Sequence, residues 1–540
     1  YKYIAGLNAY KPVETKGLSK RLNSPHAAWM AAKLNSEAIT VLKNEDTILP
    51  LKQLNKKKIA ALSIGDGVGN EFQKMLGEYD SIACFSIGRR STAAQVQQVY
   101  NKLQKYDVII CGVHTIRIPE SLALRQLAAK KELVYAFFTL PYACKEYKKS
   151  IEKAKAVVLA YEGTPLAQEY AAQVIFGGIA AKGKLPVSIP GTGIFTEKTR
   201  LGYHQPEEVG ANPDRLDVIE SIVKEGLDEK AYPGCQVLVA KDGVIIYNKS
   251  FGYFDYESRQ PVTESSVYDL ASASKAAGTL LAVMKAYDEK KFTLNNKISD
   301  FIPELKESNK KDLSIKELLY HQSGVTPTIN FYLDAIDKDS YKGSLYSSAK
   351  NATHPVRFDA KTYVRNDFKY LPDVVSDTRK PGFTTEVARN FYVSDSFKDT
   401  ILQDIKKSRL GTRGRYVYSC VNFIMLKMMV ENLMKSPMDQ LLRDDFYSGL
   451  GAWHTTYNPL KRMDTLQIVP TEQDGFVRRQ LLRGYVHDEA AAFQGGVSGN
   501  AGLFSNANDL AKVLQLMLNQ GTYGGERYLS LETSRLFTQS

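Results

Sequence analysis

The stretch YDLASASK, residues 268–275, ends in a serine and a lysine three positions apart and is followed by the apolar run AAGTLLAVM. Residues i and i+3 share one face of a helix, so a helix that begins at Ser272 places the Lys275 side chain beside the Ser272 hydroxyl. Serine needs a neighbouring base to act as a nucleophile, and a desolvated lysine can supply one. A helix-capping serine with a surface lysine has the same spacing. Ser-x-x-Lys also recurs elsewhere, at Ser150, Ser308 and Ser347.

The composition is that of a globular protein, with 540 residues, 44% hydrophobic and 24% charged. This length predicts two or three domains. The net charge of +12 is spread in short runs, so we expect a solvated surface, with a broad attraction to anionic polymers such as cell-wall glycans as the alternative, and no specific nucleic-acid binding. No apolar run approaches the ~20 residues of a membrane span. No signal peptide is visible, and we interpret the chain as a mature form or an excised piece. The five cysteines lack metal or CxxC spacing, which argues against a disulfide scaffold.

The first half alternates short apolar runs with helical segments. Five runs are expected to be buried strands: IAALSI (59–64), IACFSI (82–87), DVIICGV (107–113), LVYAFFTL (133–140) and KAVVLAY (155–161). Continuous apolar strands imply cover on both faces, which predicts a mostly parallel sheet in an α/β layer fold. The loop GDGVGN (65–70) has Asn70 where a dinucleotide fingerprint needs its third glycine, and we interpret it as a tight strand–helix turn.

The pattern changes after a cluster of Gly, Pro and Thr at 188–212, which we interpret as a linker. An amphipathic helix is expected over 215–229. Two apolar runs follow, at 235–240 and 244–253, and the Lys-Asp-Gly between them indicates a hairpin. These strands, with a long helical region from 274, predict an α+β second domain. The expected domains are therefore residues 1–200 and 210–540.

Segments around Ser272 together resemble the serine β-lactamase and penicillin-binding-protein superfamily, nearest to its class C β-lactamases, D-Ala-D-Ala peptidases and related esterases. They are YDLASASK, KKFTLNNKISDFIPEL (290–305) and IKELLYHQSGV (315–325). The resemblance implies a β-lactamase/transpeptidase-like fold, Ser272 as the nucleophile, Lys275 as a base and no cofactor. His321 matches a structural turn of the family, so we leave it out of the predicted catalytic set.

The family's second motif is Tyr-x-Asn, and it is similar to the segment RYVYSCVNFIMLKMMVE (415–431). Tyr418 takes the tyrosine position, and the resemblance implies that it shares the general-base role with Lys275. Cys420 stands where the family has a substrate-binding asparagine, and Asn422 lies two residues late. This departure argues against efficient β-lactam hydrolysis and makes Cys420 a candidate substrate contact.

Residues 485–518 resemble the esterase-like members of the superfamily. His487 and Asp488 are adjacent in this segment, which does not by itself make a catalytic pair, and we interpret them as part of a loop that borders the site. The family's third motif, Lys/His-Thr/Ser-Gly, does not occur in the sequence. That motif lies on a strand that also supplies one oxyanion-hole N–H. We therefore expect this domain to be truncated.

The first half resembles the second, α/β domain of glycoside hydrolase family 3. KLNSEAITVLKNEDTILPLKQLNKKKIAALSIG (33–65) is similar to its start and AAQVIFGGIAAKGKLPVSIP (171–190) to its end. The family's nucleophilic aspartate lies in a preceding barrel, which this chain lacks. Glu120 falls near the acid/base position of some members, but without their motif we interpret it as a surface carboxylate. This half is not expected to hydrolyse glycosides by itself.

The leading hypothesis is a serine hydrolase domain attached to the non-barrel half of a family 3 glycosidase of the β-N-acetylglucosaminidase type. Cell-wall peptides, β-lactams or small esters are the expected substrates. The fusion implies envelope glycan turnover in a periplasmic or other extracytoplasmic setting. Two alternatives stay open: a non-catalytic binding or scaffolding module, and a fragment of a protein whose main activity is glycoside hydrolysis by an upstream barrel.

Overall fold

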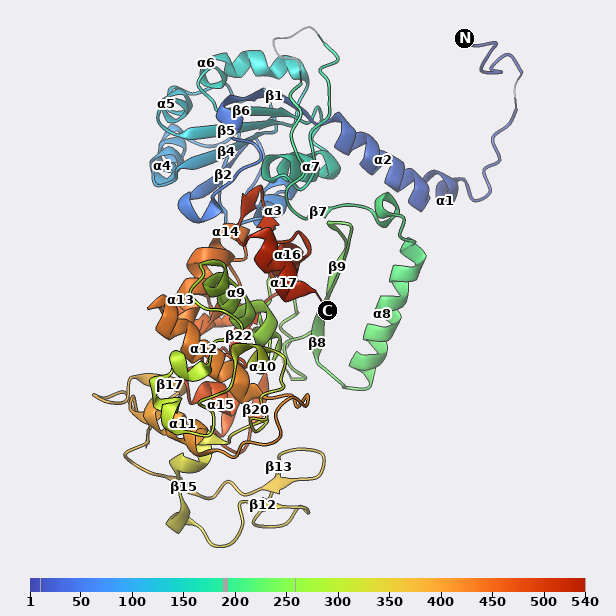
Figure 1. Ribbon diagram of the computed structural model, residues 1–540. Coiled ribbons are helices and arrows are strands. Elements are labelled where there is room, and N and C mark those ends of the chain that lie inside the picture. Colours follow the sequence, from blue (N-terminus) through green and yellow to red (C-terminus); the bar gives the residue numbers. More distant parts are fainter. Residues whose placement is uncertain (10, 188–192, 258, 540) are drawn as a thin grey trace.

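The five apolar runs of the first half form strands of one sheet in the computed structural model, which describes residues 1–9, 11–187, 193–257 and 259–539 (Figure 1). The sheet has the order β1-β6-β5-β4-β2-β3. Its strands are β1 (Thr40–Asn44), β2 (Ile59–Ile64), β3 (Ala83–Ile87), β4 (Val108–Val113), β5 (Glu132–Phe137) and β6 (Ala156–Leu159). Strands β2 to β6 run parallel and β1 runs antiparallel to β6, so the predicted mostly parallel sheet is confirmed.

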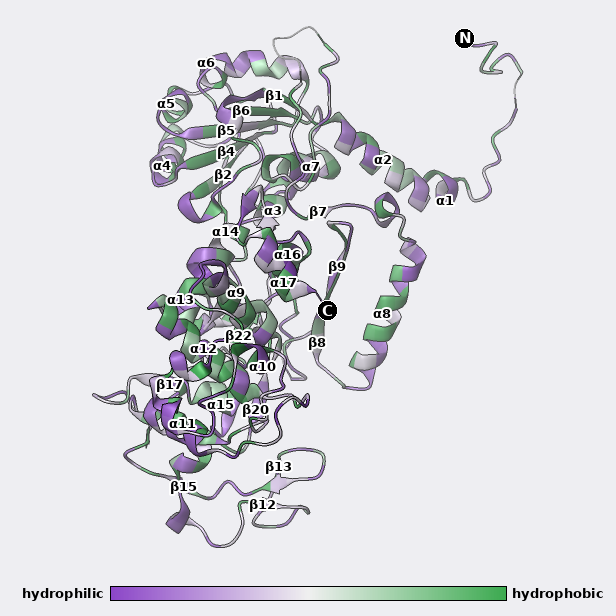
Figure 2. Cartoon of the chain, viewed as in Figure 1, coloured by the Kyte–Doolittle hydropathy of each residue, from purple (hydrophilic) through white to green (hydrophobic). Residues whose placement is uncertain are grey.

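Helices cover both faces of this sheet, as its apolar strands require. The helices are α2 (Pro25–Ala38), α3 (Glu71–Gly77), α4 (Ala93–Leu103), α5 (Leu122–Lys130), α6 (Lys148–Ile151) and α7 (Pro165–Phe176). Val108 and Ile110 of β4 belong to one buried cluster, with α3 and α7, whereas Ile109 and Cys111 belong to the other, with α4 and α5. Figure 2 shows the hydrophobic colour on β4 and α7. This alternation follows from the two-residue period of a strand.

The loop GDGVGN joins β2 to α3 as a tight turn, in agreement with the prediction. Gly65 has φ 94°, a region that side-chain-bearing residues rarely adopt, and a Cβ there would lie 2.2 Å from Thr115 Cγ2. Asn70 begins α3, because its side chain accepts a hydrogen bond from Gln73 N.

The second half begins with α8 (Pro213–Asp228) and a hairpin of β8 (Gly234–Lys241) and β9 (Val244–Gly252). Asp242 and Gly243 have φ of 53° and 73°, as the predicted hairpin turn requires. Residues 188–192 of the predicted linker lie outside the described residues. The remainder is not a free linker, because β7 (Gly202–Tyr203) pairs in parallel with β9.

The core of the second half is built mainly from helices around α12 (Cys420–Met434), which is buried along most of its length. Other helices are α9 (Leu280–Asp288), α10 (Ile315–Leu319), α11 (Phe397–Lys407), α13 (Met438–Leu442), α15 (Glu489–Ala492), α16 (Ala507–Leu518) and α17 (Leu531–Thr538). A small antiparallel sheet lies beside the segment that carries Ser272: β10 (Tyr268–Asp269), β22 (Leu503–Ser505) and β19 (Thr456–Tyr457).

Residues 336–393 form several short strand pairs that the sequence analysis did not predict. They are β11 (Ile336–Asp337), β12 (Tyr346–Ser347), β13 (Val356–Arg357), β14 (Tyr363–Val364), β15 (Lys369–Tyr370), β16 (Val375–Ser376), β17 (Thr385–Ala388) and β18 (Phe391–Val393). Most of these strands are too short to show an alternating pattern. They lie at the end of the molecule opposite the parallel sheet (Figure 1).

The two halves are joined by specific polar contacts. Asn508 of α16 accepts a hydrogen bond from the Tyr203 hydroxyl at 2.6 Å and donates one to the Glu78 carbonyl oxygen at 3.0 Å. Asn508 Nδ2 also donates to the Glu78 side chain, at 2.9 Å to Oε2. These contacts fix α16 of the second half against the end of α3.

Candidate active site

The nucleophile candidate lies on a sharp turn between β10 and the helical segment that leads into α9. Ala271 has φ 47°, in the left-handed region, and Ser272 follows it at the surface. Helix begins at Ala273, one residue later than predicted, and the Ser272 carbonyl oxygen accepts a hydrogen bond from Lys275 N. Lys275–Thr279 then form a widened π-type turn, and regular helix resumes at Leu280. The left-handed Ala271 forms the turn that presents Ser272 at the surface just before the helix.

Lys275 lies beside the Ser272 hydroxyl, as the i, i+3 spacing predicts. Its Nζ is 2.9 Å from Ser272 Oγ and donates a second hydrogen bond to the Asn500 carbonyl oxygen at 2.9 Å. The residue is only 5% exposed. The backbone of the segment before β22 therefore holds the amine in a fixed place against the serine.

Tyr418 reaches the same oxygen from the start of α12. Its hydroxyl donates to Ser272 Oγ at 3.0 Å, and Lys275 Nζ lies 5.0 Å from the centre of its ring. The structure thus brings together Ser272, Lys275 and Tyr418.

His321 lies next to this group without contacting Ser272 in any described interaction. Its ring centre is 4.7 Å from that of Tyr418, and its Nδ1 accepts a hydrogen bond from Ser419 N at 3.1 Å. Burial, with a smaller effect of the Lys275 charge, lowers the pKa of His321. A neutral ring that supports Tyr418 agrees with the predicted structural turn.

Cys420 and Asn422 occupy different environments in the first turn of α12. Cys420 is half-buried, and its N–H donates to the Pro327 carbonyl oxygen. Asn422 is fully buried: its Oδ1 accepts from Ser323 Oγ at 2.7 Å and its Nδ2 donates to the Leu318 carbonyl oxygen. Asn422 therefore ties α12 to the His-x-Ser-Gly turn and does not replace the missing asparagine at position 420.

Asp269 is a site residue that the sequence analysis missed, although it lies in the quoted stretch YDLASASK. Its carboxylate is fully buried and accepts hydrogen bonds from Ala271 N at 2.9 Å and His487 Nδ1 at 3.0 Å. His487 is thus paired with Asp269, and Asp488 faces elsewhere. The signal available in the sequence was a carboxylate three residues before the serine.

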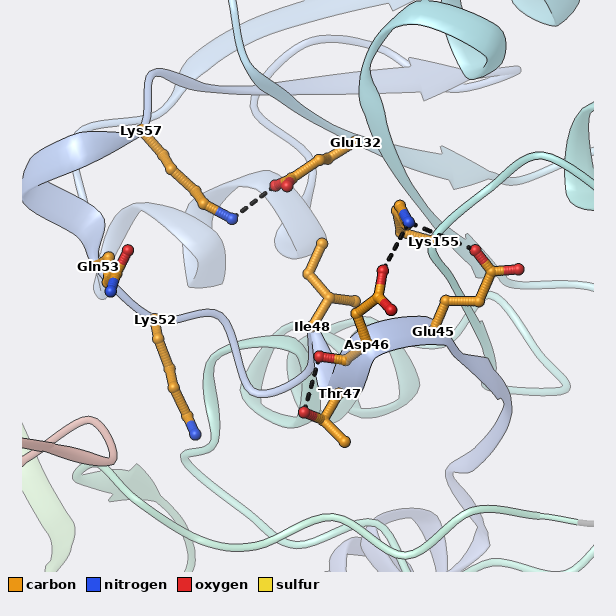
Figure 3. A pocket seen from close by; sticks show the side chains of 9 residues that line it. All are labelled: Glu45, Asp46, Thr47, Ile48, Lys52, Gln53, Lys57, Glu132 and Lys155. Atoms are coloured by element: carbon orange, nitrogen blue, oxygen red, sulfur yellow. Dashed lines mark hydrogen bonds and ion pairs between the residues drawn. The ribbon is translucent and has the colours of Figure 1, made fainter.

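Two other places, the predicted residue Glu120 and a cavity beside β1, do not form a group comparable to the one around Ser272. Glu120 was expected at the surface, but its side chain is 4% exposed, since it pairs with Arg125 and accepts from Ser150 N. A cavity of about 270 Å³ beside β1 contains charged side chains that already pair with one another, among them Lys57 with Glu132 (Figure 3).

Among the described residues, no group of three or more His, Cys, Asp or Glu side chains is placed to hold a metal ion. None of the helices in the described ranges is long and apolar enough to cross a bilayer. The five cysteines, all described, carry free thiols.

Comparison with known proteins points to one family. The model of the family described as Beta-lactamase matches residues 219–540. A putative D-alanyl-D-alanine carboxypeptidase of Escherichia coli K12 is 30% identical over 365 residues, which are 63% of this chain and 72% of that protein. One from Salmonella gallinarum is 28% identical over 366 residues, with the same coverage. The solved penicillin-binding protein homologue of Pyrococcus abyssi is 20% identical, covers 59% of each chain and has a TM-score of 0.41.

Proposed function

Because the chain belongs to the β-lactamase family, we propose that it is a serine hydrolase that works through an acyl-enzyme on Ser272. The observation that carries this proposal is the convergence of the Lys275 amine and the Tyr418 hydroxyl on Ser272 Oγ, at 2.9 and 3.0 Å. Two groups able to exchange a proton with one serine hydroxyl are what nucleophilic catalysis requires.

In the proposed acylation step, Ser272 Oγ attacks a carbonyl carbon and its proton passes to the Lys275 amine or the Tyr418 side-chain oxygen. The same proton then goes to the leaving group, whose bond to the carbonyl carbon breaks. Water hydrolyses the ester on Ser272 by the reverse route. The hydrogen bond from Lys275 Nζ to the Asn500 carbonyl keeps the amine oriented toward the serine through both steps.

For the substrate, we propose a peptide ending in D-Ala-D-Ala or a small ester. The curated relatives are named as putative D-alanyl-D-alanine carboxypeptidases, which supports the peptide. Cys420 in the place of the family's asparagine supports the ester, because a thiol is a weaker hydrogen-bond partner for a substrate amide than a carboxamide. Cys420 as a substrate contact stays a prediction.

The wider setting stays a prediction as well. The boundary between domains at 200–210, the glycoside hydrolase family 3 resemblance of the first half and an extracytoplasmic location rest on the sequence patterns. The parallel sheet agrees with the α/β fold that this resemblance implies. A non-catalytic scaffolding role is the competing proposal, and it requires Ser272 to be unreactive.

The test compares two substrates on the full-length protein. Release of D-alanine from a peptide ending in D-Ala-D-Ala and hydrolysis of p-nitrophenyl acetate are measured for the wild type and Ser272→Ala. The proposal expects hydrolysis of at least one substrate, abolished by the substitution. Equal rates in the two proteins, or no turnover of either substrate together with an unreactive Ser272, would favour the scaffolding role.

A further inference from the structure

One dipeptide, His487–Asp488, contacts two separate parts of the Ser272 site. It lies in the loop between β21 (Gln480–Leu482) and α15. His487 faces the turn that carries the nucleophile, whereas Asp488 faces the segment that holds Lys275. His487 contacts the turn through Asp269, and Asp488 contacts the Lys275 segment through Asn500.

His487 is linked through Asp269 to the turn at Ala271 that precedes Ser272. Asp269 Oδ2 accepts from both the backbone N–H and Nδ1 of His487, at 2.9 and 3.0 Å, while its Oδ1 accepts from Ala271 N at 2.9 Å. Ala271 is left-handed, a conformation that L side chains avoid unless neighbouring contacts fix it. The buried Asp269 carboxylate supplies that contact by accepting from the N–H of Ala271, the residue before Ser272.

Asp488 is linked to Lys275 through Asn500. Asp488 is the N-cap of α15, and its Oδ1 accepts from Ala491 N at 2.8 Å and from Asn500 Nδ2 at 3.1 Å. Ser498 Oγ donates to the other side-chain atom of Asn500, its Oδ1, at 2.7 Å. The Asn500 amide is therefore held from both sides, and its backbone carbonyl oxygen accepts from Lys275 Nζ.

The loop that carries the dipeptide is itself rigid. Arg478 is 3% exposed and donates to the backbone oxygens of Val486 and His487, at 2.7 and 2.5 Å. Its Nε pairs with Asp474 at 2.7 Å. A buried arginine with three oriented donors fixes the backbone of the loop that carries His487 and Asp488.

We propose that His487 and Asp488 are positioning residues that hold the nucleophile turn and the base segment in register, so that Ser272 Oγ and Lys275 Nζ stay within hydrogen-bond distance. This inference rests on the proposed function of Ser272. Neither side chain touches the reacting atoms in it. A displacement of about 1 Å in a reacting group can cost on the order of 100-fold in rate.

The hydrogen bond from His487 to Asp269 decides which substitution of His487 conserves the contact. Its pKa is raised, chiefly by the hydrogen bond to Asp269, and Asp488 and Glu472 add to the effect. A neutral imidazole with its proton on Nδ1 still donates to Asp269, so the contact needs a donor at that place more than it needs a charge. An asparagine side chain can place an N–H near the position of Nδ1.

The experiment measures how fast a fluorophosphonate labels Ser272 in the full-length protein, at several probe concentrations, which separates the maximal rate from the apparent affinity. His487→Ala and Asp488→Ala are each expected to lower the maximal rate 10- to 100-fold with an affinity within about 2-fold of the wild type. His487→Asn and Asp488→Asn are expected to recover it to within about 3-fold, since each keeps the needed polar atom. His26→Asn, at an exposed residue of α2, is the matched control.

Hydrogen–deuterium exchange keeps the inference separate from the proposed function. The peptide spanning residues 266–281 is expected to exchange faster in His487→Ala than in the wild type, and a peptide from β4 is expected to stay unchanged. Alanine variants with wild-type labelling rates would overturn the positioning role. Should the wild type not be labelled at all, the proposed function fails, and unchanged exchange in 266–281 would then overturn the positioning role independently.

Discussion

Tyr418 lies 146 residues after Ser272 in the chain, yet its hydroxyl donates a hydrogen bond to Ser272 Oγ at 3.0 Å. Lys275, only three residues after the serine, reaches the same oxygen at 2.9 Å. The local partner comes from helical spacing and the distant one from the packing of α12 against the nucleophile segment. The proposed activity depends on both.

Removing either proton-exchanging group should slow catalysis with little effect on binding. Lys275→Ala and Tyr418→Phe are each expected to lower kcat about 100- to 10,000-fold, because general acid–base catalysis contributes on that order, while KM changes little. Initial rates with p-nitrophenyl acetate measure this. Tyr416→Phe is the matched control, since Tyr416 is 64% exposed and contacts His321 only at its edge. A Tyr418→Phe variant with more than half of the wild-type kcat would contradict the shared role.

Restoring the family's asparagine should change substrate preference. Cys420→Asn is expected to speed acylation by a β-lactam about 5-fold and to leave ester hydrolysis unchanged, since one amide hydrogen bond is worth about 1 kcal/mol. Stopped-flow measurement with nitrocefin checks this, with Cys420→Ser as the control. Equal acylation rates in all three proteins would remove position 420 from the substrate site.

Asn422 should affect stability and not substrate binding. Asn422→Ala leaves the buried Ser323 hydroxyl without its acceptor and removes one donor to the Leu318 carbonyl oxygen, so we expect the free energy of unfolding to fall by about 1–3 kcal/mol. Urea unfolding measures the loss, and Asn101→Ala on the exposed face of α4 is the control. A raised KM with unchanged stability would show instead that Asn422 contacts substrate.

Asp80, at the junction of the two halves, should make stability depend on pH. Burial raises its pKa from 3.8 to about 6. The folded state therefore binds more protons than the unfolded state between these values, and the free energy of unfolding falls as pH rises from about 4 to about 6. Asp80→Asn, which can still accept from Ser81 N, removes the buried charge.

We expect Asp80→Asn to be more stable than the wild type by about 1–3 kcal/mol at pH 8 and equally stable near pH 3.5. Denaturant unfolding at the two pH values checks this. Asp377→Asn, at an exposed position, should change neither value by more than about 0.5 kcal/mol. A variant that loses stability at pH 8 would mean that the Asp80 carboxylate is stabilising at the junction.

The sequence predicted those parts of the fold that local patterns determine. The strands of the parallel sheet and the β8–β9 hairpin were expected within a few residues, because their apolar runs and turn residues are contiguous. The sequence did not predict contacts between residues that are far apart in the chain, or strands of only two to four residues. Nothing local indicated that Asp269 pairs with His487, 218 residues away, or that Glu120 is buried. The short strands of 336–393 are held by pairing and packing, which leave no period in the sequence.

The most direct test of the central claim is the site of covalent labelling in the native, full-length protein. After exposure to a fluorophosphonate, intact mass and peptide mass spectrometry are expected to show one adduct, on Ser272, which is lost in Ser272→Ala and slowed in Lys275→Ala. Labelling at another residue, or no adduct in a folded wild-type protein, would contradict the account.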